Sequence, residues 1–152
     1  MTPKLFANLF ENFAFEYFDY VQSPDLFLRN RSGDCDDYAI LGDYILRRAG
    51  FNTRLIRVEL VGTRFSHAVC YVTEKKAYLD YNLRAYFINL QRSGAGIREI
   101  ATRVADSFGQ NWTSATEYTY SYIEVRSRAL RTVVKTDPPE RDPDRQPAPP
   151  NR

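Results

Sequence analysis

The sequence predicts an α+β domain in which a central helix packs on an antiparallel β-sheet. Apolar residues recur at intervals of three and four in residues 3–20 and 34–49, a spacing typical of amphipathic helices. From residue 55 to residue 81 the period changes to two, which is typical of strands. Helices followed by a run of strands, without strict alternation, indicate the α+β class.

The first two helices have clear boundary signals. We expect the first helix to cover residues 3–20 and to end at Ser23 and Pro24. The second helix should begin at Asp34, whose carboxylate can cap the first turn. It should end before Gly50, which stands in the usual stop position.

The rest of the chain predicts four strands and one more helix. Strands over residues 55–60, 65–72 and 77–81 should pair as an antiparallel meander. Residues 97–108 have helical spacing, and residues 116–125 alternate as a strand does. We expect these elements to belong to one sheet and its covering helices.

The composition changes near the carboxyl end, so we expect one domain over residues 1–135 and a tail over residues 136–152. The tail holds six of the eight prolines and mixed charges. Such a segment cannot bury enough apolar surface to fold. It is therefore predicted to be a disordered tail, or a linker to a further part of a larger protein.

Charge and hydropathy exclude two classes of partner. The 21 basic and 19 acidic side chains leave a net charge of +2. That balance provides no basic footprint for a nucleic acid, so we expect none as a partner. No uninterrupted apolar run reaches membrane length, and charged residues interrupt the apolar start of the chain. We therefore expect no membrane partner and a cytoplasmic location.

Three side chains occur in the order of a cysteine-based catalytic site. Cys35 lies at the start of the second predicted helix, and His67, the single histidine, lies on a predicted strand before Asp80. A thiol attacks as thiolate, and a helix N-terminus or an imidazolium lowers the pKa of a thiol. Opposing side chains on paired strands lie roughly 5 Å apart, so Asp80 can orient the His67 imidazole. We expect folding to bring the three together.

The neighbouring polar residues have simpler interpretations. Cys70 alternates with His67 along its strand, so it should point to the opposite sheet face as a buried packing residue. Asp34 is expected to be a helix cap, and Asp37 a structural hydrogen-bond acceptor. Cys35 itself could be an inert buried thiol, but the three aspartates around it favour a special site.

These residues also carry a family resemblance. Residues 33–39 (GDCDDYA), followed by residues 67–69 (HAV) and 79–80 (LD), resemble the transglutaminase-like superfamily, especially its bacterial cysteine-peptidase branch. The resemblance extends over residues 31–82, about a third of the chain. It implies a papain-related core.

The resemblance also implies a chemistry. Cys35 would be the nucleophile, His67 the general base and then acid, and Asp80 the orienting carboxylate. The reaction would transfer an acyl group from an amide of a protein or peptide through a thioester. Water as the acceptor would give a peptidase, and an amine would give a transglutaminase. The bacterial character of the motif favours hydrolysis.

Two further features follow from the resemblance. The backbone N–H of Cys35 would stabilise the tetrahedral intermediate, and the amide side chains available upstream as a second donor are Gln22 and Asn30, either of which could instead be a turn residue. Some relatives bind calcium through acidic residues beside the cysteine, and Asp34 and Asp36 match those positions. No other cofactor is expected.

A second function fits the same residues. The domain could be catalytically silent and act as a protein-binding module within a larger assembly. Only 34 residues precede Cys35, where relatives carry a longer lobe, and the tail is consistent with a linker. The intact set of Cys35, His67 and Asp80 favours the enzyme.

Overall fold

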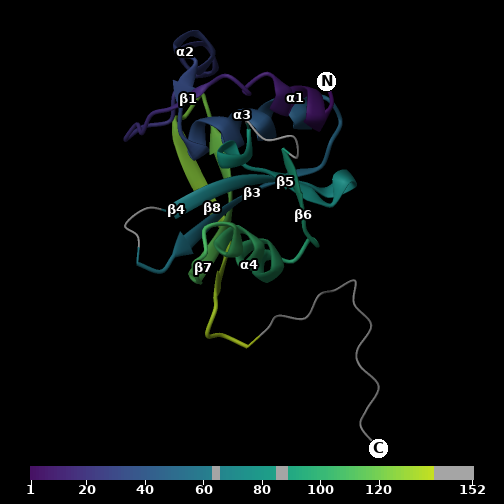
Figure 1. Cartoon of the computed structure of the whole chain (residues 1–152), viewed down its shortest axis with the longest axis vertical. Coiled ribbons are helices and arrows are strands. Elements are labelled where there is room, and N and C mark those ends of the chain that lie inside the picture. Colours follow the sequence, from purple (N-terminus) through teal and green to yellow (C-terminus); the bar gives the residue numbers. More distant parts are fainter. Residues whose placement is uncertain (63–65, 85–88, 139–152) are drawn as a thin grey trace, which may run out of the picture.

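The computed structural model describes residues 1–62, 66–84 and 89–138 and confirms the α+β class. A six-stranded antiparallel sheet forms its centre (Figure 1). Its strands are β3 (Thr53–Leu60), β4 (Ser66–Val72), β5 (Ala77–Leu79), β6 (Leu90–Arg92), β7 (Trp112–Ser121) and β8 (Arg126–Val134). They lie in the order β6-β5-β4-β3-β7-β8.

Helices cover both faces of this sheet. The three helices α1 (Pro3–Asn8), α2 (Pro24–Asn30) and α3 (Cys35–Arg48) lie on one side, and α4 (Ile97–Ser107) lies on the other (Figure 1). A small parallel sheet joins β1 (Ala14–Phe15) to β2 (Ser32–Gly33) just before α3. Two short 3-10 helices, η1 (Thr73–Lys75) and η2 (Tyr81–Leu83), flank β5.

Helix α3 has the boundaries that the sequence predicts. The side chain of Asp34 accepts hydrogen bonds from the backbone N–H groups of Asp36 and Asp37, which satisfies two donors that the first turn leaves without a helical partner. At the other end Gly50 has a φ of +98°, a conformation that costs glycine little. Both ends of α3 are therefore set by local chemistry.

The central strands also follow the sequence, with differences at the edges. Strands β3, β4 and β5 form the predicted antiparallel meander. Strand β7 begins at Trp112 and ends at Ser121, earlier than the predicted residues 116–125. The chain turns after Ser121, with Val125 at a φ of +54°, and returns as β8, which pairs with β7. The alternation of residues 116–125 predicts one continuous strand and gives no sign of this turn. Edge strand β6 spans only three residues, too few for an alternating pattern to indicate a strand.

The predicted helix over residues 3–20 is wrong beyond Asn8. Residues 14–15 instead form β1, which pairs with β2. Phe10 and Phe13 turn inward, and both rings contact Phe27 at centroid distances of 5.3 Å. Tertiary pairing and aromatic packing override the helical spacing of this segment.

The Ser23 and Pro24 pair begins a helix instead of ending one. The Ser23 hydroxyl accepts a hydrogen bond from the Leu26 N–H, and Pro24 occupies the first helical position. Proline suits that position because its missing N–H has no partner there in any case. The resulting helix, α2, carries Phe27 into the core.

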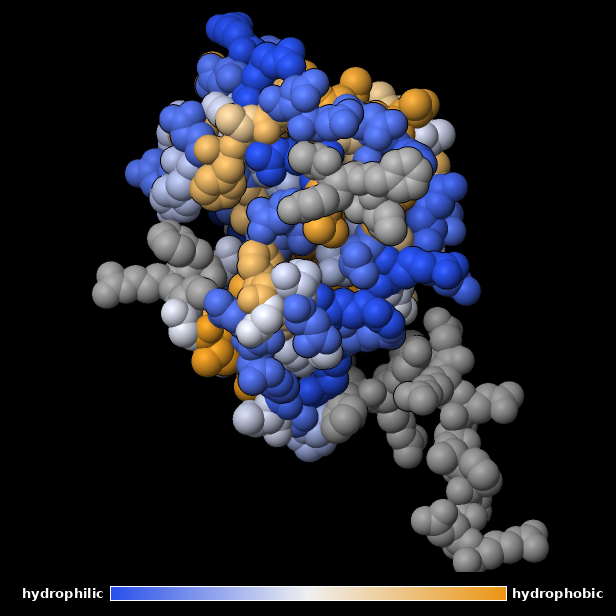
Figure 2. Space-filling view, viewed as in Figure 1, coloured by the Kyte–Doolittle hydropathy of each residue, from blue (hydrophilic) through white to orange (hydrophobic). Residues whose placement is uncertain are grey.

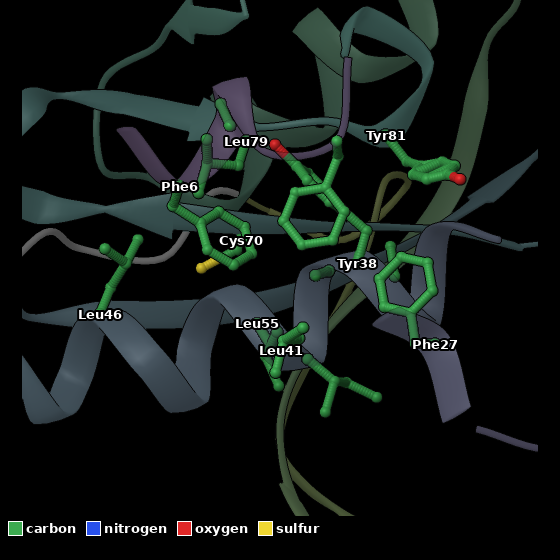
Figure 3. Packing of buried hydrophobic residues seen from close by; sticks show 14 of the residues in the cluster. Phe6, Phe27, Tyr38, Leu41, Leu46, Leu55, Cys70, Leu79 and Tyr81 are labelled. Atoms are coloured by element: carbon green, nitrogen blue, oxygen red, sulfur yellow. The ribbon is translucent and has the colours of Figure 1, made fainter. Parts of the chain in front are cut away.

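Aromatic rings fill the core between α3 and the sheet (Figure 3). Tyr38 lies at its centre, with ring centroids 5.3 Å from Phe6 and 5.2 Å from Phe10. Cys70 is fully buried in the same cluster, and burial holds the pKa of its thiol well above the usual value. Its predicted role as a packing residue is confirmed.

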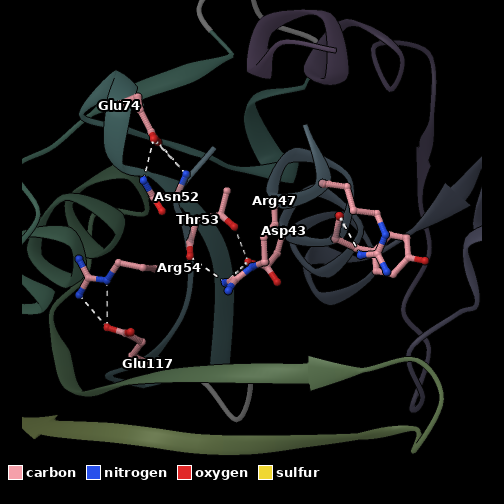
Figure 4. A network of polar contacts seen from close by, with 9 residues as sticks. Asp43, Arg47, Asn52, Thr53, Arg54, Glu74 and Glu117 are labelled. Carbon is pink, nitrogen blue, oxygen red and sulfur yellow. Dashed lines mark hydrogen bonds and ion pairs between the residues drawn. The ribbon is translucent and has the colours of Figure 1, made fainter. Parts of the chain in front are cut away.

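Polar contacts fix the far end of α3 to the sheet (Figure 4). Asp43 accepts a hydrogen bond of 2.6 Å from the Thr53 hydroxyl, and Arg47 bridges Asp43 and the Thr53 carbonyl at 3.0 Å each. A helix held at both ends cannot slide along the sheet. These contacts therefore help to fix where its first residue, Cys35, is presented.

The molecular surface is mostly hydrophilic in the view of Figure 2, with hydrophobic residues in small separate groups. Isolated apolar side chains of this kind are normal on a folded domain. Across the described ranges, no helix has both the length and the apolar character needed to cross a membrane.

Candidate active site

Cys35 is the first residue of α3 and is half-buried. The capping residue before it, Asp34, holds the first turn through bonds of 3.1 Å and 3.2 Å from the N–H groups of Asp36 and Asp37 to its Oδ1. Its Oδ2 accepts a third bond, 3.1 Å long, from the Phe18 N–H. The backbone that presents the sulfur is thus tied to the segment before α2.

The buried carboxylate of Asp37 connects the first turn of α3 to the preceding segment. The Asp37 carboxylate accepts three hydrogen bonds. Gln22 donates two of them, from its backbone N–H at 2.7 Å and from its side-chain amide at 2.9 Å, and the Asp34 N–H donates the third at 3.1 Å. A Cβ at Gly33 would lie 2.7 Å from the Asp37 carboxylate and from the Phe27 ring. Only glycine leaves room for this approach. Asp37 is the structural acceptor that the sequence predicts.

His67 lies at the start of β4 and contacts Asp80, which follows β5. The His67 Nε2 and the Asp80 Oδ1 are 2.8 Å apart, and both residues are buried. The same Asp80 oxygen accepts a bond of 2.9 Å from the Asn82 N–H. On its other side the imidazole packs edge-on against the Phe108 ring at a centroid distance of 4.8 Å. The orientation of the imidazole is therefore fixed.

The structure brings Cys35 next to His67 as well. Burial acts to lower the pKa of His67, but the negative charge and hydrogen bond of Asp80 outweigh it, and a hydrogen bond with Cys35 adds to the effect. Together they raise the pKa of His67 to about 10. Because Nε2 faces Asp80, Nδ1 is the nitrogen left for Cys35. The charge of Asp80 therefore favours the protonated imidazole beside the sulfur.

Cys35 and His67 line a pocket of about 690 Å³, and Asp80 contacts His67 from outside the pocket lining. Several elements contribute to it, all at the end of the sheet nearest the first turn of α3. Its walls are Phe15, Tyr17, Asp34, Cys35, Asp36, Leu60, Ser66, His67, Asn82, Phe108 and Gln110. The pocket therefore combines aromatic and apolar surface with a thiol, an imidazole and two amide side chains, as a site for a partly apolar substrate would.

The expectation that Gln22 or Asn30 serves as a second oxyanion donor does not agree with this geometry. The Gln22 amide donates to the Ser32 carbonyl and to Asp37 at 2.9 Å each. Its oxygen accepts from the Asn30 amide, also at 2.9 Å. Neither residue lines the pocket. Both amides instead form hydrogen bonds that connect the segment before α2, the end of α2 and the first turn of α3.

Calcium fits poorly at Asp34 and Asp36. Three backbone N–H groups already occupy both oxygens of Asp34. Asp36 forms an ion pair with Arg57 at 3.5 Å, and Arg57 also lies over the Tyr118 ring. In the described ranges no three potential metal ligands gather at one place. Calcium needs six to eight oxygen ligands, which these two carboxylates do not supply.

Sequence reasoning missed most of the pocket wall. Phe108 and Gln110 follow α4, more than 70 residues after Cys35, and no local motif marks them. The only signal nearby is Gly109, which ends the predicted helix and has a φ of +64°. A turn after a helix is common, so this signal alone could not indicate a binding residue.

Comparison with known families defines the class of protein to which this fold and site belong. The family described as transglutaminase-like domain matches residues 3–94, more than half of the chain. The chain therefore belongs to the transglutaminase-like domain family. The match includes Cys35, His67 and Asp80 and ends before α4.

A solved structure adds a more distant likeness. It is a candidate cysteine protease from Cytophaga hutchinsonii, 15% identical, with a TM-score of 0.39. The alignment covers 91% of this chain and 46% of that one, so the chain spans about half the length of its neighbour. No curated protein matches the chain.

Proposed function

We propose that this domain catalyses amide hydrolysis or acyl transfer on a protein or peptide, with Cys35 as nucleophile. One observation carries the proposal: His67 contacts Cys35 on one side and Asp80 on the other, at an open pocket. Family membership supports the same class of chemistry. The roles of the three residues are those of a cysteine-based triad.

In the first half of the reaction the Cys35 thiolate attacks the carbonyl carbon of the substrate amide. A carbon–sulfur bond forms and the carbonyl electrons move to oxygen, where the backbone N–H of Cys35 stabilises the negative charge. The intermediate collapses as the carbon–nitrogen bond breaks. His67 donates its proton to the departing nitrogen, so an amine and a thioester result.

In the second half His67, now neutral, accepts a proton from the attacking water or amine. The new bond to the carbonyl carbon displaces the sulfur of Cys35 as thiolate, and the imidazolium is restored. Asp80 keeps its hydrogen bond of 2.8 Å to Nε2 throughout, so Nδ1 stays directed at the sulfur. We favour water as the acceptor, which makes the domain a peptidase.

Alkylation with iodoacetamide between pH 5 and 8 tests the proposal, because the chain contains its own reference. Cys35 is half-buried beside the His67 imidazole, whereas Cys70 is fully buried. We expect Cys35 to be alkylated already at pH 6, where Cys70 does not react. In His67→Ala the thiolate loses its counter-ion, and alkylation at pH 6 should fall at least tenfold. Mass spectrometry of tryptic peptides separates the two sites.

The alternative, a silent binding module, predicts a different result. In that case His67→Ala would leave the pH dependence of Cys35 alkylation unchanged, since the contact would serve packing alone. Asp80→Asn provides a graded control, because it keeps the shape of the side chain and removes its charge. An intermediate loss of reactivity in Asp80→Asn would agree with the enzyme.

A further inference from the structure

Gln110 lines the pocket, and its Oε1 is buried without a hydrogen bond from any part of the chain that the structure describes. Asp36 Oδ1, on the same pocket, also lacks a hydrogen bond, but it forms an ion pair with Arg57 at 3.5 Å. Buried polar atoms nearly always have a hydrogen-bond partner, so an exception on a pocket wall calls for an explanation. A ligand in the pocket would supply one.

The backbone at Gln110 is anchored, while no hydrogen bond from the described residues holds its amide oxygen. The Gln110 N–H donates to the Ala105 carbonyl of α4 at 3.0 Å, and Gly109 directs the chain into this position. The terminal torsion of a glutamine is broad and twofold, so the amide can offer either its oxygen or its NH₂ group. An anchored residue with a rotatable amide suits the recognition of a peptide main chain.

Apolar surface surrounds this amide. Phe108 lies two residues before Gln110 and touches the His67 ring, and Leu60 lines the same pocket. Phe15 and Tyr17 also line the pocket, and they are 60% and 59% exposed. Such a wall takes a large apolar side chain in preference to a charged one.

We propose that Gln110 hydrogen-bonds to the main chain of a peptide substrate while the aromatic wall holds a large apolar side chain of that peptide near the bond that Cys35 attacks. The inference rests on the proposed function and deepens it by naming the substrate class. Phe15, Tyr17 and Leu60 lie within residues 3–94 of the family match, whereas Phe108 and Gln110 lie outside it.

Two peptidyl fluoromethyl ketones test the substrate class. Benzyloxycarbonyl-Phe-Ala and benzyloxycarbonyl-Gly-Ala fluoromethyl ketones differ in one side chain. In each, the thiolate sulfur of Cys35 forms a thioether with the methylene carbon and displaces fluoride, and His67 keeps its proton. The wild-type protein should react at least fivefold faster with the Phe reagent. Phe15→Ala, at an exposed position, should bring the two rates to within twofold of each other.

The role of Gln110 is tested by a ratio of rates: the alkylation of Cys35 by the Phe reagent divided by its alkylation by iodoacetamide. Gln110→Met keeps the length of the side chain and removes its hydrogen bonds, so the ratio should fall at least fivefold. Gln110→Glu retains an acceptor and should give an intermediate ratio. Gln91→Met, on β6 and away from the pocket lining, is the matched control and should keep the wild-type ratio.

Each outcome has one meaning. An unchanged ratio in Gln110→Met, whether both rates stay or both fall, overturns the role of Gln110 in substrate binding. Equal rates of the two peptidyl reagents with wild-type protein overturn the apolar preference. Failure of the proposed function is separate, since it appears as iodoacetamide labelling that does not depend on His67. Labelling of buried Cys70 identifies any variant that has unfolded, and Gln110→Glu then replaces Gln110→Met.

Discussion

His67 and Asp80 form a contact of 2.8 Å in which the side chains are only 9% and 1% exposed. A charged pair at this depth is stabilising only while both partners keep their charge, because each alone would be an uncompensated buried ion. The pair therefore couples the stability of the domain to the protonation of the imidazole.

The first prediction concerns pH. The folded state raises the pKa of His67 to about 10, because the charge and hydrogen bond of Asp80 outweigh the opposing effect of burial. Between pH 6.5 and 10 the folded state thus holds a proton that the unfolded state has lost. The stabilisation is complete below pH 6.5 and declines as pH rises through this window, by at most about 1.4 kcal/mol per pH unit.

Urea unfolding at pH 6, 7, 8 and 9 measures this effect when Cys35→Ala is compared with Cys35→Ala/Asp80→Asn. The thiol interacts with His67, so its removal from both proteins leaves the imidazole proton alone to be measured, and the other titrating groups cancel in the difference. The advantage of the protein that keeps Asp80 in free energy of unfolding should shrink steadily as pH rises. Two curves that stay parallel from pH 6 to pH 9 would show that the pair carries no proton linkage.

The agreement between the predicted and observed boundaries of α3 shows which parts of the fold are determined by local sequence. Its cap at Asp34 and its stop at Gly50 are local signals, and both boundaries agree with the structure. The segment before it has equally regular helical spacing, yet the outer members of that pattern, Leu5, Leu9 and Tyr17, are more than half exposed. Pairing with residues 32–33 decides its conformation, and periodicity contains no information about such a distant partner.

The candidate site also has a part that the sequence predicts and a part that it does not. Cys35, His67 and Asp80 could be selected from sequence because the chemistry restricts each position to one residue type in a recognisable order. The pocket wall could not, since a phenylalanine and a glutamine after a helix serve many roles. Their position beside His67 depends on how α4 packs against the far face of the sheet. That packing involves contacts between parts of the chain far apart in sequence.

The second prediction concerns the close packing at Gly33. A Cβ there would lie 2.7 Å from the Asp37 carboxylate and 2.9 Å from the Gln22 amide. Gly33→Ala should therefore lower the free energy of unfolding by about 1–3 kcal/mol. Gly96→Ala is the control without close packing, because a Cβ at Gly96 meets nothing within 4 Å; Gly96 is the N-cap of α4, where alanine is less favourable, so the loss should stay below about 1 kcal/mol. Equal effects of the two substitutions in chemical denaturation would refute the packing argument.

The third prediction contrasts two tyrosines of the same aromatic core. The Tyr38 hydroxyl is buried without a hydrogen-bond partner in the described part of the chain, whereas the Tyr81 hydroxyl donates a bond of 2.6 Å to the Ala14 carbonyl. Tyr38→Phe removes an unsatisfied polar group and should raise the free energy of unfolding by about 1 kcal/mol. Tyr81→Phe should lower it by a similar amount. Thermal and urea unfolding of both variants check the opposite signs, and a loss of stability in Tyr38→Phe would count against the packing described here.

The fourth prediction concerns Asp34, the cap of α3. Burial, and after it the charge of Asp37, raise the pKa of Asp34 from 3.8 to about 6, while hydrogen bonds from Phe18 and Asp37 act in the opposite direction. The folded state therefore binds a proton between pH 3.8 and 6 that the unfolded state has lost. The stability contribution of Asp34 is largest below pH 3.8 and declines as pH rises to 6.

Asp34→Asn keeps one capping oxygen and removes the titration. At pH 4 the variant should be less stable than wild type by about 1 kcal/mol, because the Phe18 N–H loses its acceptor. Between pH 4 and pH 6 this deficit should shrink, since only the wild-type protein comes to bear the buried charge. Asp34→Ala also loses the cap, so its deficit should be about 1 kcal/mol larger at every pH but should change with pH in the same way. A deficit that stays constant across this range in both variants would mean that Asp34 is ionised throughout and that Asp37 and the surrounding protein do not oppose its charge.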